Sequence, residues 1–260
     1  GYGLDVENEL KMLRVIKKAQ SLTKATLVPT CLSAHLKPRD FDGSNEEYLN
    51  YILDEILPKV KAEKLANRVD IFIEKSAFQP DESKAFLLKA KEMGFDITVH
   101  ADQFRPGGSN IAVDFSAISA DHLEASSDKE IQILCESNTI AVALPGASMG
   151  LGVAYTPARK LLDGGGSLAI ASDWNPGSAP MGDLLMQASV LGTFEKLSNA
   201  EVLAGITYRA AAALGIKNRG TLEFGKLADI ILFPTDDYKE ITYQQGRLKP
   251  TIIIKNGVRV

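Results

Sequence analysis

The side chains best suited to chemistry in this chain are three histidines and one aspartate, each following an apolar run. His35 comes after the apolar pair at 27–28, His100 after residues 95–99, His122 after 117–120 and Asp173 after 167–171. Short apolar runs predict buried strands. In a parallel α/β barrel the residues that end the strands face one shared mouth. The pattern therefore predicts one site whose groups bind zinc or iron and move protons around it.

Each imidazole has a functional and a structural interpretation. As a metal ligand, His100 uses one ring nitrogen while an acceptor behind it holds the other, but a lone histidine at a strand end is more often structural. His122 can ligate, donate to a developing oxyanion or shuttle a proton. The alternative is that Asp121 caps a helix and His122 beside it is incidental.

Asp173 is the main candidate for a carboxylate that both binds a metal and accepts the proton of an attacking water. The alternative is a helix N-cap. Behind it, Gly177 and Ser178 can present N–H groups and a hydroxyl to an anion such as a carboxylate, although Asn175 with Pro176 and these two residues is also a common turn.

Two further positions have weaker signals. His35 can stack on or hydrogen-bond a planar substrate at the rim. Glu74 can orient a ligand or pair with Lys75, and the structural alternative is a solvated or ion-paired carboxylate. The glycine-rich segment 105–109 lacks nucleotide-binding spacing and predicts a tight turn that opens a helix.

Strand-like and helix-like segments alternate, which predicts βαβ crossovers and a parallel sheet. The expected strands are 25–32, 69–73, 97–99, 117–120, 139–144 and 168–172; the expected helices are 6–21, 46–65, 80–93, 111–115, 128–136, 157–163, 181–191 and 199–214. Asp81 or Ser83 is expected to cap the third helix. The tail predicts short strands at 230–233 and 251–254, with a hairpin turn at 255–258.

Six strands are two fewer than a closed barrel requires. We therefore expect an α/β fold of the TIM-barrel type, with a partial barrel over residues 1–215 and part of a small β module over 216–260. The other two strands are expected to precede Gly1.

The bulk properties narrow the functional classes. The chain has 260 residues, 45% of them hydrophobic, and a net charge of -4. This charge argues against a nucleic-acid surface, and no apolar run approaches the ~20 residues of a membrane span. Cys31 and Cys135 form no disulfide framework, which is typical of reduced thiols in a cytoplasmic protein.

Taken in order, several motifs resemble the imidazolonepropionase family of the amidohydrolase superfamily. The resemblance covers essentially the whole chain, and its specificity comes from the order of the motifs, since each alone is weak. They are Gly1-Tyr2-Gly3-Leu4, Ser33-Ala34-His35, Val99-His100-Ala101-Asp102, Ser119-Ala120-Asp121-His122-Leu123-Glu124, Leu144-Pro145-Gly146-Ala147, Asp173-Trp174-Asn175-Pro176-Gly177-Ser178 and the superfamily-wide segment 220–229.

The resemblance implies hydrolysis of 4-imidazolone-5-propanoate to N-formimidoyl-L-glutamate with one divalent metal, zinc or iron, in a homodimeric enzyme of histidine degradation. It implies His100 and Asp173 as metal ligands and His122 as the group that stabilises the oxyanion or bound water. The implied substrate-binding residues are Tyr2, His35, Asn175, Gly177 and Ser178. The family's arginine for the propanoate carboxylate is expected upstream of Gly1.

Two departures from the family pattern keep alternatives open. The sequence contains no His-x-His pair, so two ligands remain where a catalytic zinc takes three. Gln103 stands where the family has a glutamate that contacts water and substrate, and glutamine cannot take a proton. The alternatives are a related cyclic amidohydrolase or deaminase, and an inactive fragment that survives by association through uncovered strand edges and apolar faces.

Overall fold

The computed structural model describes residues 3–260, so Tyr2 lies outside the described part of the chain. Its main sheet has six parallel strands in chain order, each paired with the next. They are β1 (Thr30–Ala34), β2 (Arg68–Phe72), β3 (Asp96–Ala101), β4 (Ser119–His122), β5 (Ile140–Ala143) and β6 (Leu168–Ile170). Sequential parallel order with helical crossovers confirms the expected barrel-type α/β fold.

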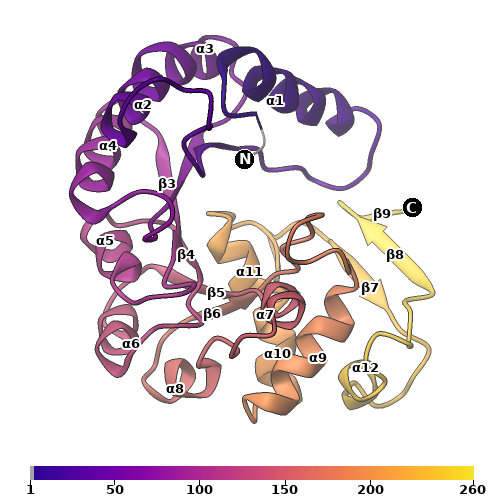
Figure 1. Ribbon diagram of the computed structural model, residues 1–260. Coiled ribbons are helices and arrows are strands. Elements are labelled where there is room, and N and C mark those ends of the chain that lie inside the picture. The colour runs from indigo at the N-terminus through magenta and orange to yellow at the C-terminus, as the bar shows by residue number, and fades with distance from the viewer. Residues whose placement is uncertain (1–2) are drawn as a thin grey trace.

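Helices cover the outer face of the curved sheet, as the arc from α1 to α6 shows (Figure 1). The helices are α1 (Val6–Gln20), α2 (Asn45–Tyr51), α3 (Leu57–Ala62), α4 (Pro80–Glu92), α5 (Gly108–Asp114), α6 (Asp128–Cys135), α7 (Pro145–Leu151), α8 (Ala158–Asp163), α9 (Leu184–Phe194), α10 (Asn199–Gly205), α11 (Tyr208–Ala213) and α12 (Lys239–Tyr243); a π-helical segment, Ile52–Ile56, joins α2 to α3. Within residues 3–260, no helix has the length and apolar character needed to cross a bilayer.

The tail forms a second, antiparallel sheet of three strands, β7 (Ile230–Leu232), β8 (Ile252–Lys255) and β9 (Val258–Arg259). It lies beside α12, on the opposite side of the molecule from α4–α6 (Figure 1). The expected hairpin turn joins β8 to β9, where Asn256 and Gly257 both have positive φ, of 52° and 79°. Two consecutive positive φ values are typical of a tight hairpin turn and explain the Asn-Gly pair.

The strands alternate between an outer face that packs on helices and an inner face that carries polar groups. On β2, Val69 and Ile71 are fully buried in the hydrophobic core, whereas Asp70 lines an inner cavity. Thr98 and His100 on β3 line the same cavity. Because successive side chains of a strand point to opposite faces, this sheet serves both as a core wall and as a scaffold for chemistry.

Several local expectations were wrong. The first strand begins at Thr30 and not at residue 25, because residues 25–29 pair with no neighbouring strand. The segment 199–214 forms two helices, since the backbone at Thr207 (φ -123°, ψ -103°) breaks the helical path. A helix that the sequence did not predict, α7, begins at Pro145 directly after β5, where proline's fixed φ suits the first turn.

The start of α4 also differs from the expectation. Gln79 is the N-cap, and its N–H donates to the Glu82 carboxylate at 2.6 Å. Ser83 instead donates its hydroxyl to the Gln79 carbonyl at 2.7 Å. A glutamate at the third helical position is the reciprocal half of a capping box, so neither Asp81 nor Ser83 is needed as the cap.

Candidate active site at the carboxyl ends of the strands

A cavity of about 290 Å³ lies where the strands of the main sheet end. It contains the site residues expected from the sequence except Glu74, which does not line it, and Tyr2, which is outside the described residues. The lining consists of Leu32, His35, Phe72, His100, Gln103, Phe104, His122, Leu151, Asp173, Asn175, Gly177 and Ser178. The structure thus brings together side chains from β1, β2, β3, β4 and the segment after β6.

His100 is held from behind by a carboxylate of the neighbouring strand. Its Nδ1 lies 2.5 Å from Asp70 Oδ1, and the Thr98 hydroxyl donates to Asp70 Oδ2 at 2.5 Å. Burial lowers the pKa of His100, but the Asp70 carboxylate more than offsets this and the pKa rises to about 9. An ionised neighbour within hydrogen-bond distance favours the imidazolium form.

Asp121 brings a second carboxylate to the inner side of His100. Asp70, His100 and Asp121 place one ligand atom each within 4.8 Å of one another, and Asp121 Oδ1 is buried without a hydrogen-bond partner. Burial and the charge of Asp70 raise the pKa of Asp121 to about 6. The residue lies inside β4 and caps no helix, contrary to the structural alternative for this position.

His35 presents a neutral ring to the cavity. It stacks on Phe72 with ring centroids 5.3 Å apart and meets the His100 ring edge-on at 5.6 Å. Burial and the nearby His100 lower the pKa of His35 to about 4. Its Nδ1 is buried and has no hydrogen-bond partner. A planar ligand could therefore find both an aromatic face and an unused nitrogen here.

His122 is supported by a carboxylate of its own strand end. Its Nδ1 is 3.4 Å from Glu124 Oε1, which also accepts a hydrogen bond from the Ser148 hydroxyl at 3.0 Å. The Thr156 hydroxyl donates to the His122 carbonyl at 2.5 Å. Both His122 and Glu124 are nearly inaccessible to solvent, with side chains 4% and 2% exposed. This packing holds the imidazole in one orientation toward the cavity.

Asp173 lies just after β6 and shares the cavity with His100 and His122. Burial raises the pKa of its carboxyl, and the two histidines oppose this rise. A carboxyl with a raised pKa is a better proton acceptor at neutral pH than an ordinary aspartate.

The turn that follows Asp173 is organised by Asn175. Asn175 Oδ1 accepts the N–H groups of Gly177 and Ser178 at 2.8 and 2.9 Å, and its amide donates to the Asp173 carbonyl. The two N–H groups expected to face an anion are thus engaged within the turn in this structure.

Gln103 is anchored through the loop that follows it. Buried Glu74 accepts the N–H groups of Phe104 and Arg105 at 3.1 and 3.2 Å, and it pairs with the Arg105 guanidinium at 3.1 Å. Glu74 is therefore an ion-paired carboxylate, as one structural alternative for this position expected, but its partner is Arg105 and not the Lys75 side chain. Sequence reasoning gave no role to Asp70, Thr98 or Ser148, although an aspartate inside an apolar run signals a partnered buried charge.

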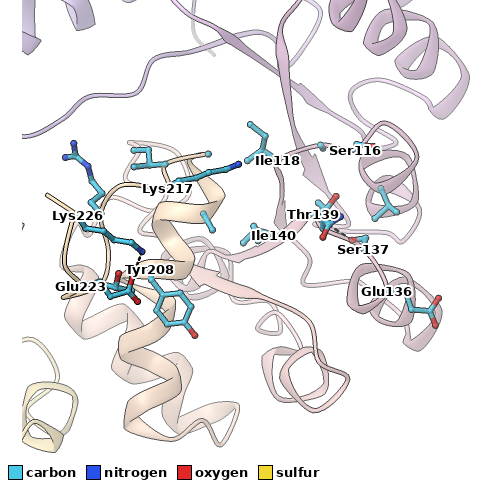
Figure 2. Close-up of a pocket in the computed structure, with 18 residues that line it drawn as sticks. Ser116, Ile118, Glu136, Ser137, Thr139, Ile140, Tyr208, Lys217, Glu223 and Lys226 are labelled. Carbon is cyan, nitrogen blue, oxygen red and sulfur yellow. Dashed lines mark hydrogen bonds and ion pairs between the residues drawn. The ribbon is translucent and has the colours of Figure 1, made fainter.

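Two other cavities are relevant to the location of the functional site. An inner one of about 350 Å³ is lined by Arg68, Asp70, Asp121, and also by His100 and Asp173, which line the mouth as well. The largest, about 1020 Å³, lies at the opposite ends of β4 and β5. Figure 2 shows Ser116, Ile118, Thr139 and Ile140 on one side of it and Tyr208, Lys217 and the Glu223–Lys226 ion pair on the other. This cavity contains none of the predicted site residues that the structure describes.

The chain is similar to known proteins over most of its length. The model of the amidohydrolase family matches residues 54–260. An imidazolonepropionase of Bdellovibrio bacteriovorus is 41% identical over 262 residues, and one of Bacillus cytotoxicus is 39% identical over 260 residues. These alignments cover 100% and 99% of this chain and 61% of each relative, so the chain spans about three-fifths of their length.

Solved structures show the same fold at low sequence identity. A zinc-bound adenosine deaminase from Xanthomonas campestris superposes with a TM-score of 0.72 at 17% identity, over 95% of this chain and 63% of the deaminase. A triazine hydrolase variant gives a TM-score of 0.68 at 14% identity, over 94% of this chain and 62% of the hydrolase.

Proposed function

The chain belongs to the amidohydrolase family, and from that premise we propose that it hydrolyses the ring amide of 4-imidazolone-5-propanoate to N-formimidoyl-L-glutamate, a step of histidine degradation. The observation that carries the proposal is the single cavity that gathers His35, His100, His122 and Asp173. The names of the relatives at 37–41% identity support the choice of substrate.

His100 and Asp173 are the proposed ligands of one divalent metal, zinc or iron, when it is bound. Both residues line the mouth and the inner cavity, and imidazole nitrogen with carboxylate oxygen is a donor set that suits either ion. The unpartnered buried oxygen of Asp121 beside them is a further donor that this structure leaves unused. Such an ion would polarise the amide and lower the pKa of water.

The chain's own groups divide the remaining work. Asp173 accepts the proton of the attacking water and later returns it to the leaving nitrogen. His122, fixed by Glu124, donates to the oxygen that becomes negative as water adds. Gln103 hydrogen-bonds the water or the substrate without taking a proton.

Substrate binding falls to groups at the rim and to the turn after Asp173. His35 and Phe72 form a stacked pair that a planar imidazolone ring can join. Asn175, Gly177 and Ser178 are the proposed contacts to its polar groups, together with Tyr2. Asn175 Oδ1 already accepts the N–H groups of Gly177 and Ser178. To contact the substrate, the turn must therefore open, or its other polar atoms must make the contacts.

The decisive test is hydrolysis in H₂¹⁸O. The purified chain is supplied with Zn²⁺ or Fe²⁺ and 4-imidazolone-5-propanoate, and the product is analysed by mass spectrometry. We expect N-formimidoyl-L-glutamate with one ¹⁸O in its new carboxylate, and no product from Asp173→Asn at unchanged folding. Full turnover by Asp173→Asn would contradict the role of this residue, and no product from the metal-supplied parent would contradict the proposed activity.

A related deaminase or cyclic amidohydrolase is the second candidate, because Gln103 stands where the resembled family has glutamate. Deamination replaces an exocyclic amine and releases ammonia, whereas ring opening of the imidazolone does not. Ammonia release from an aminated heterocycle, without turnover of imidazolonepropionate, would favour this second function.

The wider organisation is also a proposal. We place the barrel-type domain at residues 1–215 and the small β module at 216–260, which contains the three-stranded sheet. We further propose a homodimer that acts in the cytoplasm on a small molecule, without nucleic-acid or membrane partners.

A further inference from the structure

We propose that Asp70 is the positioning residue of His100: it fixes the proton of this histidine on Nδ1, so that Nε2 is the nitrogen offered to a ligand. The inference rests on the proposed function only in treating His100 as a metal ligand. Asp70 itself contacts neither the mouth cavity nor the substrate region, since it lines the inner cavity alone.

The sheet register places the carboxylate behind the imidazole. Asp70 pairs with Thr98 across β2 and β3, and Phe72 pairs with His100 two residues further along. Asp70 Oδ1 is 2.5 Å from His100 Nδ1. Of the two ring nitrogens, Nδ1 is therefore engaged toward the inner side, and Nε2 is left for the mouth that the same ring lines.

The carboxylate is itself held in place. Its second oxygen accepts the Thr98 hydroxyl at 2.5 Å, and its side chain is only 4% exposed. A buried carboxylate with both oxygens engaged cannot rotate freely, and an ionised acceptor makes a shorter and stronger hydrogen bond than a neutral one. Asp70 therefore fixes both the tautomer and the ring orientation of His100, as a carboxylate behind a ligating histidine does.

Asp121 provides a matched comparison. It is a half-buried aspartate that lines the same inner cavity from β4, the strand on the opposite edge of β3 from β2, and its Oδ1 has no hydrogen-bond partner. It affects His100 through charge, whereas Asp70 acts through a direct contact with Nδ1. If the effect on His100 depends on hydrogen bonding, only substitutions of Asp70 will change it. If the effect depends on negative charge alone, substitutions of Asp70 and of Asp121 will both change it.

The first test needs neither metal nor substrate. Protein labelled with ¹⁵N-histidine has three imidazoles, and the His100→Gln spectrum identifies the signals of His100. At a pH high enough to leave the imidazole neutral, we expect the parent to carry the proton on Nδ1, the nitrogen in contact with Asp70. Asp70→Ala should release it to both nitrogens, while Asp70→Asn, which keeps an acceptor oxygen, and Asp121→Asn should keep the Nδ1 tautomer.

Two results would overturn the proposal: an unchanged His100 tautomer in Asp70→Ala, or an equal change in Asp121→Asn. If Asp70→Ala does not fold, Thr98→Val serves as the second variant. It frees Asp70 Oδ2, and weaker protection of the His100 Nδ1 proton is expected. An unchanged exchange rate of the Nδ1 proton would contradict the proposal that Asp70 holds His100 in place.

The second test measures Zn²⁺ affinity by competition with a chelator. Asp70→Ala, which releases the proton of His100 to both ring nitrogens, is expected to bind Zn²⁺ about 10- to 100-fold more weakly than the parent, the usual effect of removing a partner behind a metal ligand. Equal affinity of parent and variant would contradict the proposal. If the parent binds no Zn²⁺, the proposed metal function fails, and the tautomer measurement still decides the role of Asp70.

Discussion

Four residues at the carboxyl ends of the strands have a left-handed backbone although none is glycine. Asp102, His122, Leu123 and Asp173 have φ values of 52°, 85°, 69° and 48°. Such conformations cost on the order of 1–3 kcal/mol each and gather at functional sites. Two of these residues, His122 and Asp173, line the mouth. The left-handed backbone turns the chain sharply where these strands end, so the pleat does not continue beyond them.

Gln103 allows a direct test of the family mechanism. Glutamate can take a proton and glutamine cannot, so Gln103→Glu is expected to raise kcat on imidazolonepropionate by about 10- to 100-fold. Steady-state kinetics measures the change. Gln132→Glu, an exposed glutamine on α6, is the control and should leave kcat unaltered. An unaltered kcat in Gln103→Glu would show that this position does not limit the reaction.

His35 should make the fold sensitive to acid. Its folded pKa of about 4 lies below the ordinary 6.5, so between these values the unfolded chain binds more protons and stability rises with pH. Acidification through this window should cost up to about 3 kcal/mol. His35→Phe, which keeps an aromatic partner for Phe72, should remove that slope.

Urea unfolding of the parent and of His35→Phe at pH 7 and near pH 4.5 measures this effect. Comparing the two proteins cancels the titration of the other groups, Asp121 and His100 included. Equal losses of stability in parent and variant would show that His35 is not the source.

At the scale of elements, the sequence predicted which strands end in candidate functional residues. It did not predict which side chains of neighbouring strands contact each other. Periodicity revealed the apolar runs of β3, β4 and β6, and polar residues directly after them pointed to His100, His122 and Asp173. Asp70 was not predicted as a functional residue because it lies in the middle of β2, and its partner His100 lies 30 residues away in the sequence. Cross-strand register depends on tertiary pairing, which periodicity along one strand does not contain.

The start of α5 depends on a single buried carboxylate. Asp102 Oδ1 accepts the N–H groups of Gly108 and Ser109 at 2.7 and 3.1 Å, and Oδ2 accepts the hydroxyls of Ser109 and Ser126 at 2.5 and 2.7 Å. Asp102→Ala leaves these donors unpaired and is expected to lower the free energy of unfolding by about 3 kcal/mol.

Urea denaturation checks this expectation against Asp236→Ala. Asp236 is exposed, and its replacement should change stability by no more than ~0.5 kcal/mol. Equal small effects of the two substitutions would mean that water or nearby groups replace the carboxylate of Asp102.

At the scale of the whole molecule, the inner surface of the sheet is divided into a polar and an apolar side. β2, β3 and β4 contribute Asp70, His100 and Asp121, whereas β5, β6 and the residues directly after them contribute apolar residues to the inner cavity: Val142, Leu144, Ala169, Ile170 and Ala171. The charges are therefore concentrated around His100. Opposing charges at this density are tolerated only when they are paired or hold a cation.

Metal binding should therefore stabilise the entire fold. Zn²⁺ at about 100 times its Kd contributes ~2.7 kcal/mol, which for a chain of this size raises Tm by about 5–10 °C. Differential scanning calorimetry with Zn²⁺ should show this rise, and EDTA should reverse it. Asp173→Asn should lose most of it. An equal rise in Asp173→Asn would place the stabilising ion elsewhere.

The alternation along the strands separates two kinds of evolutionary pressure. Outward positions such as Val69, Ile71 and Val99 are constrained only by packing against the helices that cover them. Other apolar residues can therefore replace them over time. Inward positions such as Asp70 and His100 answer to the reaction and cannot change one at a time. Among the strand residues, we expect the outward-facing positions to vary faster than the inward-facing ones in descendants of this sequence. New substrate preferences are expected to arise in the loops beyond the strand ends.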